Sequence, residues 1–215
     1  PLDLAHRVPE GVRPGDDVVV LVHGFMATAG VFRPMRRALE ERARAKVASF
    51  SHAPGEGVER IAKKLHRLVE KLPEGVRLHL VGHSLGGLVA RYYVQELGGA
   101  AKVTQTISIA SPFFGTKVAH LFPLLVGKDL HRESEVLARL RARAHEHEVP
   151  HLSLLAEADR VVVPETSAMF PVGEVVSFRD RGHNSLLYDP RSIDLIVERV
   201  RGVDPCPKSR RLHTI

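Results

Sequence analysis

Residues 81–87 read Val-Gly-His-Ser-Leu-Gly-Gly and fit the pattern G-x-S-x-G. Before this stretch, residues 77–81 (Arg-Leu-His-Leu-Val) have the apolar content of a short buried strand. After it, residues 88–97 (Leu-Val-Ala-Arg-Tyr-Tyr-Val-Gln-Glu-Leu) have the spacing of an amphipathic helix. The sequence therefore predicts that Ser84 lies on a sharp turn between a strand and a helix.

This position suits a nucleophile. A serine hydroxyl attacks a carbonyl carbon only when a base removes its proton, and it must stand clear of the sheet. A tight turn exposes it but brings backbone segments too close for side chains, and Gly82 and Gly86 have no Cβ. The Leu85 N–H lies where the helix begins, and positive partial charge there favours an oxyanion. The alternative is a glycine-rich turn with an exposed serine and no chemistry, so partner residues must decide.

Length and composition predict one domain over residues 1–215. The chain has 44% hydrophobic and 26% charged residues, which suits a single substantial core. Its one cysteine, Cys206, cannot form an internal disulfide. No apolar run approaches the roughly 20 residues that cross a bilayer, so we expect a soluble protein. Because the sequence begins at Pro1, removal of a signal peptide stays open, and so does the choice between cytoplasm and secretion.

The net charge of +6 raises the question of an anionic partner. Basic residues are spread over predicted helices and interleave with acidic ones, as in residues 33–46, 59–71 and 132–143. Aromatic residues make up only 5% of the chain, and no nucleic-acid motif accompanies the charge. We therefore expect no nucleic-acid binding, whereas transient contact with acidic lipid surfaces stays open.

Apolar runs alternate with helical patterns along the chain. The continuous run at 17–22 is typical of a strand covered on both faces. About six strands are predicted, at 17–22, 46–50, 77–81, 103–110, 151–155 and 174–178, with helices at 31–45, 58–72, 88–97 and 191–200. This alternation predicts an α/β fold with a mostly parallel sheet and helices on both faces.

A longer excursion at 111–150 separates the fourth and fifth predicted strands. It begins apolar and ends as a charged helix. Ligands of such sheets bind beyond the carboxyl ends of the strands, so we expect this excursion to form a small cap, or a lid, over the site.

A serine nucleophile needs an acid and a base, in loops after later strands. Asp159 follows the strand at 151–155 and is our acid, with Glu157 and Asp180 as alternatives. His183 follows the last predicted strand, next to Gly182, and is our base.

The oxyanion hole needs two N–H donors. We assign them to Leu85 and to Phe25, in the turn after the first strand; an ordinary strand-end turn is the alternative. His23 and His83 flank the site, and we expect them to pack and hydrogen-bond beneath the turn that carries Ser84 rather than to transfer protons.

Together, residues 21–25 (Leu-Val-His-Gly-Phe), 81–87, 159–164 and 182–183 make the chain resemble the α/β-hydrolase superfamily, and most of all the small microbial lipases and esterases. Residues 109–116 (Ile-Ala-Ser-Pro-Phe-Phe-Gly-Thr) are similar to a segment of those enzymes. The resemblance implies a compact hydrolase sheet, with Ser84 as nucleophile, His183 as base, Asp159 as orienting acid, and the N–H groups of Phe25 and Leu85 as oxyanion donors.

Two departures from larger members are visible. The sequence shows neither extra antiparallel strands ahead of residue 17 nor the paired aspartates that hold a structural calcium. A second metal candidate, His145-Glu146-His147-Glu148 with His151 nearby, places alternating residues in different directions on a helix. We therefore predict no metal.

Apolar residues around the expected site point to an apolar acyl chain, although each could instead belong to the core. The candidates for substrate contact are Met26, Phe113, Phe114, Leu121, Phe122 and Met169, with Phe25, Pro123, Leu124, Leu125 and Phe170 as further apolar neighbours.

The expected function is hydrolysis of carboxylic esters through an acyl-enzyme on Ser84, without a cofactor. A thioesterase or acyltransferase could use the same three residues, and a non-catalytic binding protein of this fold is the remaining alternative. The natural ester and the oligomeric state are not predicted.

Overall fold

The computed structural model describes residues 8–121, 124–202 and 211–214. Its centre is a sheet in which neighbouring strands all run parallel, in the order β2-β1-β3-β4-β5-β6-β7. The strands are β1 (Asp17–Val22), β2 (Lys46–Phe50), β3 (Arg77–His83), β4 (Val103–Ile109), β5 (His151–Ala156), β6 (Glu174–Phe178) and β7 (Arg211–Thr214). Parallel pairing places all carboxyl ends at one rim, where the loops that follow the strands meet.

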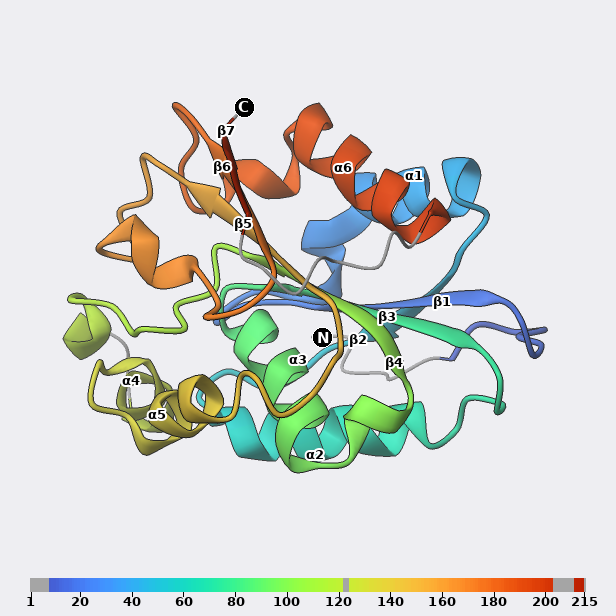
Figure 1. Ribbon diagram of the computed structural model, residues 1–215, viewed down its shortest axis with the longest axis horizontal. Coiled ribbons are helices and arrows are strands. Elements are labelled where there is room, and N and C mark those ends of the chain that lie inside the picture. Colours follow the sequence, from blue (N-terminus) through green and yellow to red (C-terminus); the bar gives the residue numbers. More distant parts are fainter. Residues whose placement is uncertain (1–7, 122–123, 203–210, 215) are drawn as a thin grey trace.

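Helices cover both faces of this sheet (Figure 1). One pair, α2 (Val58–Val69) and α3 (Leu85–Glu96), lies on one face, and the other pair, α1 (Arg33–Arg42) and α6 (Pro190–Arg201), lies on the opposite face. Short 3₁₀ turns connect the elements: η1 (Ala29–Phe32), η2 (Gly99–Ala101), η4 (Glu165–Ala168) and η5 (Ser185–Leu187). No helix in the described ranges combines the length and apolar character that crossing a membrane requires.

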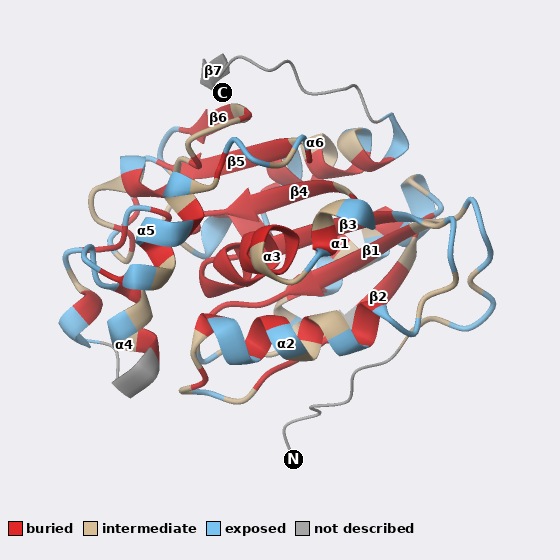
Figure 2. Ribbon diagram, turned by 60° about the horizontal axis from the view of Figure 1, so that its bottom comes forward, coloured by how far each residue is buried: buried red, intermediate tan, exposed pale blue. Residues whose placement is uncertain are grey.

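The core consists of two apolar layers, one on each side of the sheet. In β1, Val18, Val20 and Val22 pack into the layer under α2 and α3, whereas Val19 and Leu21 pack into the layer under α1 and α6. Figure 2 shows β1, β3, β4 and β5 largely buried, while α2 and α6 expose their outer sides and α3 is buried almost throughout. The continuous apolar run at 17–22 is explained by this burial on both faces.

The predicted fold class is confirmed, and the six predicted strands are all present within a residue or two of their expected ends. A seventh strand, β7, was not predicted. It has only four residues, Arg-Leu-His-Thr, which is too short and too polar for an apolar run to signal it. The helix expected at 31–45 begins as the turn η1 and ends at Arg42, shortly before Arg44 adopts a positive φ of 55°.

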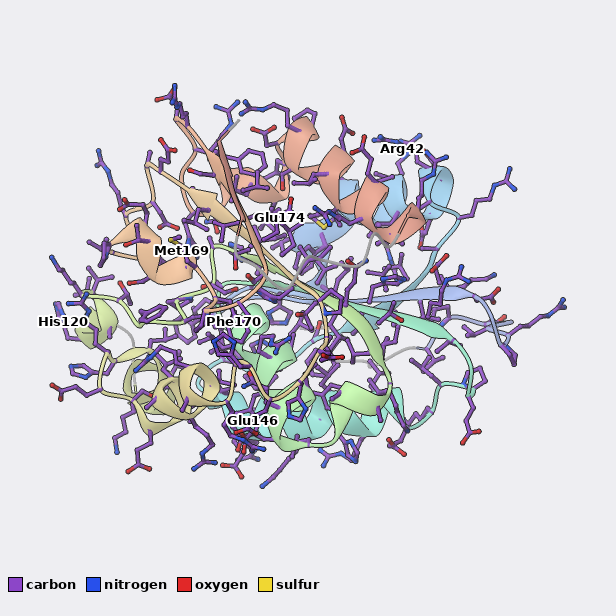
Figure 3. The ribbon with its side chains drawn as sticks, viewed as in Figure 1. Arg42, His120, Glu146, Met169, Phe170 and Glu174 are labelled. Carbon is purple, nitrogen blue, oxygen red and sulfur yellow. The ribbon has the colours of Figure 1, made fainter. Side chains whose placement is uncertain are left out.

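Helix α3 differs from the prediction of an amphipathic helix at 88–97. It begins at Leu85, directly after Ser84, and residues 85–95 are all buried, because α2, α5 and the sheet enclose it. Even Arg91 is fully buried: its guanidinium lies 4.4 Å from the centre of the Phe170 ring and donates to Thr106 Oγ1 at 3.2 Å (Figure 3 labels Phe170). Burial lowers the pKa of Arg91 to about 9.

The excursion at 111–150 contains η3 (Ala119–Leu121), α4 (Leu124–Leu130) and α5 (Glu135–Ala142). In Figure 1, α4 and α5 lie together at one end of the sheet. Asp129 accepts a hydrogen bond from the N–H of Val58 at the start of α2 (2.6 Å), and Arg143 donates to Glu96 at the end of α3 (2.8 Å). These contacts fasten the cap to both helices of one face. Its motion as a lid stays a prediction.

Candidate active site

Ser84 lies between the last residue of β3 and the first residue of α3. Its backbone has φ 53° and ψ −119°, a conformation that non-glycine residues rarely adopt. Two hydrogen bonds hold the turn: the Ser84 N–H donates to the Ile109 carbonyl at 2.8 Å, and the Gly87 N–H donates to the Ser84 carbonyl at 3.1 Å. The strained turn predicted at Ser84 is therefore present.

The glycines of the turn are required by close backbone contacts. A Cβ on Gly82 would lie 2.3 Å from the backbone of Gly86, and a Cβ on Gly86 would lie 2.0 Å from the carbonyl oxygen of Val22. The second contact shows that the turn rests directly on the end of β1. Ser84 and the loop at 23–27 are thus built against each other.

Asp159 and His183 meet at the same rim from loops after β5 and β6. His183 Nδ1 lies 2.7 Å from Asp159 Oδ2, and the other oxygen of Asp159 accepts hydrogen bonds from the N–H groups of Val161 (2.7 Å) and Val162 (2.9 Å). The two side chains are 2% (Asp159) and 10% (His183) exposed. With Nδ1 donating to the carboxylate, Nε2 of His183 is the nitrogen that can accept a proton.

The alternative acids lie in other environments. Glu157 accepts a hydrogen bond from the Ser177 hydroxyl at 2.5 Å, and Asp180 is exposed with a positive φ of 54°. Among the three carboxylates that the sequence left open, only Asp159 has a hydrogen bond to His183 in the described residues.

His83 connects Ser84 to the loop of His183. Its Nε2 donates to the backbone carbonyl of His183 at 3.2 Å, and the two imidazole centres are 4.7 Å apart. Burial, and then the neighbouring His183, lower the pKa of His83 to about 3. A ring that stays neutral and already donates Nε2–H is suited to holding a loop.

The loop of His183 has a second support that the sequence analysis missed. The Arg181 guanidinium donates to Asp189 at 2.5 Å, while the Arg181 carbonyl accepts the N–H of Ala158, the residue before Asp159, at 3.0 Å. Hydrogen bonds from Arg191, Arg181 and the backbone outweigh burial and hold the pKa of Asp189 well below its ordinary value. Arg181 therefore joins the acid loop, the base loop and the start of α6.

The turn at 23–27 carries the predicted second oxyanion donor. The Ala27 N–H donates to the Gly24 carbonyl at 3.4 Å, and Met26 has a positive φ of 57°. Next to this turn lie the buried, stacked rings of His23 and His52. His52 had no place in the sequence prediction, because it follows β2 and belongs to no motif.

The predicted substrate contacts fall into different environments. Phe113 is fully buried and packs against His151 and Phe170, so it belongs to the core and leaves the set of candidates. Phe114 (41%), Met26 (70%) and Leu121 (70%) are exposed. Met169 is half-buried against the core, and Phe122 lies outside the described residues.

A cavity of about 460 Å³ lies in the cap rather than at Ser84. Its walls are formed by Ala119, His120, Gly127, Lys128, His131, Glu133 and Ser134. Figure 3 shows His120 at the outer edge of the cap, far from Phe170 in the interior. None of Ser84, Asp159 and His183 lines this cavity, so we do not place the reacting ester there.

Of the residues named as a metal candidate, His145 and Glu146 are exposed, whereas His151 is buried. In the part of the chain that the structure describes, no three His, Cys, Asp or Glu side chains are arranged to hold a metal ion. His151 instead hydrogen-bonds Thr106 (2.7 Å) and Ser108 (3.1 Å) inside the sheet.

The chain matches one family among known proteins. The profile of the family described as Putative serine esterase (DUF676) matches residues 13–142, which is more than half of the chain. The chain belongs to the DUF676 family. The match includes Ser84 and Phe25 and ends before Asp159 and His183. Membership of DUF676 therefore bears on the turn that carries Ser84, whereas the acid and the base are assigned from their geometry alone.

Solved structures similar to this DUF676 member share its fold. The product of the gene lin2722 from Listeria innocua has a TM-score of 0.67 at 17% identity, covering 92% of this chain and 98% of its own. Est1E from Butyrivibrio proteoclasticus has a TM-score of 0.63 at 16% identity, covering 91% and 90%. The mature lipase BlEst2 of Bacillus licheniformis has 0.54 at 16%, covering 70% of each chain. A search of curated protein sequences gave no significant match.

The chain is therefore a hydrolase of the α/β fold, and its family is described as Putative serine esterase.

Proposed function

We propose that the protein hydrolyses carboxylic esters with apolar acyl chains, with Ser84 as nucleophile, His183 as base and Asp159 as orienting acid. The observation that carries the proposal is the 2.7 Å hydrogen bond between His183 and Asp159 at the rim where Ser84 follows β3. A carboxylate on Nδ1 leaves Nε2 as a proton acceptor, which is what a serine nucleophile needs.

In the acylation half, Ser84 Oγ attacks the ester carbonyl carbon while its proton passes to Nε2 of His183. The electron pair of the carbonyl bond moves to the carbonyl oxygen, and the N–H groups of Phe25 and Leu85 stabilise the negative charge that forms there. The bond to the alcohol oxygen then breaks, and the alcohol leaves with the proton from His183. Asp159 stabilises the imidazolium that exists between these steps.

In the deacylation half, water replaces the alcohol. His183 takes a proton from the water as its oxygen attacks the acyl carbon, and the Ser84 oxygen leaves with that proton. The free carboxylic acid departs and the enzyme returns to its starting state. Every proton is carried by this chain's own residues.

Exposed apolar residues in the turn at 23–27 and in the cap support an apolar acyl group. Met26 follows the proposed oxyanion donor, while Phe114 and Leu121 belong to the cap. Together with the net charge of +6, they also favour brief contact with an acidic lipid surface.

A p-nitrophenyl ester series of rising acyl length tests the proposal. We expect hydrolysis that increases from acetyl to longer chains, loss of turnover in Ser84→Ala, and unchanged turnover in Ser185→Ala, a control at an exposed serine. A fluorophosphonate should label the wild-type chain at Ser84 and leave Ser84→Ala unlabelled. Retained turnover or labelling in Ser84→Ala would refute the nucleophile.

Two further measurements define the substrate. Thioesters assayed beside the oxygen esters, with added alcohols as acceptors, separate an ester hydrolase from a thioesterase or an acyltransferase. Hydrolysis rates measured below and above the solubility limit of the substrate test the contact with a lipid surface. A sharp rise in rate once the substrate aggregates indicates that the enzyme acts at the surface of the aggregate.

A further inference from the structure

Two histidines that take no part in the proposed reaction meet at the start of the turn at 23–27. His23 follows β1 and His52 follows β2, and both side chains are buried. Their rings are stacked, with centres 4.0 Å apart and planes inclined by 19°.

A reciprocal pair of hydrogen bonds joins the two residues. The backbone N–H of His52 donates to Nε2 of His23 at 3.2 Å, and Nε2 of His52 donates to the backbone carbonyl of His23 at 3.1 Å. These bonds continue the pairing of β1 with β2 beyond its last pair, Val22 and Phe50. His52 thus holds both the ring and the backbone of His23.

The same contacts decide where His23 carries its proton. Because Nε2 accepts the N–H of His52, the proton lies on Nδ1, which donates to the Gly24 carbonyl at 2.8 Å. Burial, and then the neighbouring His52, lower the pKa of His23 to about 4. The ring is therefore neutral near pH 7, as an accepting Nε2 requires.

The Gly24 carbonyl matters because it shares a peptide unit with the Phe25 N–H. The two groups lie in one plane and point in opposite directions. A hydrogen bond that fixes the carbonyl therefore also fixes the direction of the N–H. The Ala27 N–H, which donates to the same oxygen at 3.4 Å, closes the turn around this peptide.

We propose that His52 is a positioning residue for the oxyanion hole: its backbone N–H holds His23 in one tautomer, its ring holds the backbone of His23 in one orientation, and His23 in turn aims the N–H of Phe25 at the substrate oxygen. The inference rests on the proposed function of Ser84 and Phe25. It assigns a role in catalysis to a residue that acts only through its neighbour.

The first test reads the tautomer directly in the wild-type protein. Nitrogen-15 NMR of the imidazoles at pH 7 should show His23 neutral with its proton on Nδ1. A proton on Nε2 of His23, or a charged ring, would overturn the proposal, because neither state can accept the N–H of His52.

The second test separates stacking from hydrogen bonding. His52→Phe keeps an aromatic ring and the backbone N–H, but it removes the Nε2–H donor to the His23 carbonyl, whereas His52→Gln can place an N–H near that carbonyl. We expect His52→Phe to lower kcat about tenfold with KM changed less than twofold, and His52→Gln to recover a substantial part of kcat. The matched control is His66→Phe on α2, where a histidine lies against Tyr93 at 5.9 Å.

The third readout is binding of a trifluoromethyl ketone, whose adduct with serine places an oxyanion in the hole. Its affinity should fall in parallel with kcat in His52→Phe. Equal losses in the Phe and Gln variants, or a kcat loss without a matching loss of ketone affinity, would reduce His52 to a packing residue. If wild-type turnover does not depend on Ser84, the proposed function fails; if it does and the His52 variants keep full kcat, only this inference fails.

Discussion

Asp159→Asn tests the proposed reaction most sharply, because the structure dictates how the new amide must lie. Oδ1 of Asp159 accepts the N–H groups of Val161 and Val162 at 2.7 and 2.9 Å. An asparagine would keep its oxygen there and place its NH₂ group against His183. Nδ1 of His183 would then accept a hydrogen bond, so the proton would move to Nε2, where it blocks transfer from Ser84.

The magnitude follows from two losses. Turning the amide to restore the useful tautomer would sacrifice two backbone hydrogen bonds, which costs about 2 kcal/mol. Losing the buried carboxylate beside a protonated imidazole adds about 3 kcal/mol. A total of about 5 kcal/mol corresponds to a loss of about 10⁴ in kcat, since 1.36 kcal/mol is tenfold in rate.

Single-turnover and steady-state hydrolysis of p-nitrophenyl butyrate measure this loss. Glu157→Gln and Asp180→Asn serve as controls, because both remove a carboxylate from the same pair of loops without a contact to His183 in the described residues. The thermal midpoint should change little in all three variants. An Asp159→Asn enzyme that keeps a tenth of wild-type kcat, or a control that loses more than Asp159→Asn, would refute the assignment.

Three further outcomes are expected. Gly86→Ala places a Cβ 2.0 Å from the Val22 carbonyl oxygen, so it should lower the free energy of unfolding, measured by chemical denaturation, by about 3 kcal/mol. The control Gly30→Ala should change this free energy little, because its Cβ meets only Thr28, at 3.4 Å. Equal effects of the two substitutions would contradict the close contact at Gly86. Burial alone would raise the pKa of Asp17, but hydrogen bonds from His79 and Arg77 lower it from 3.8 to about 2. Asp17→Asn should therefore cost about 2 kcal/mol of stability at pH 7, and the difference should shrink as the pH falls from about 4 through 2; a difference that does not depend on pH would exclude this ion pair as its cause. Phe114→Ser should lower kcat/KM for octanoyl esters about tenfold and leave acetyl esters unchanged, and a uniform loss would remove Phe114 from the acyl site.

The sequence predicts most of the sheet because strands that are buried on both faces appear as continuous apolar runs. The apolar run at 17–22 identifies β1, and the glycines around Ser84 identify the turn that follows β3. Asp159 was chosen by its place after β5, and the structure adds the physical reason, since two backbone N–H groups hold its carboxylate in the direction of His183.

Contacts between distant segments could not be predicted in this way. His52 meets His23 only because β2 lies beside β1, and the carbonyl of Arg181 meets the N–H of Ala158 only because the loops after β5 and β6 lie side by side. Phe113 and Phe114 show a further limit. They are neighbours in an apolar stretch, yet one is in the core and the other is exposed, because the backbone direction between β4 and the cap decides which side chain enters the core.

Backbone hydrogen bonds connect each loop of the proposed triad to the neighbouring strand or loop. Ser84 bonds to the end of β4, Ala110 to the end of β5, Glu157 to the end of β6, and Ala158 to Arg181. The 40 or so residues of the cap leave and re-enter between two strands that are already paired with each other. The start of this segment is tied to the acid loop, because the Thr116 hydroxyl donates to the Val161 carbonyl at 2.7 Å and accepts the Val163 N–H at 3.1 Å. Exchanging only the part of the cap that follows Lys117 would therefore leave the spacing of nucleophile, acid and base intact, so new substrate ranges could be grafted onto unchanged chemistry.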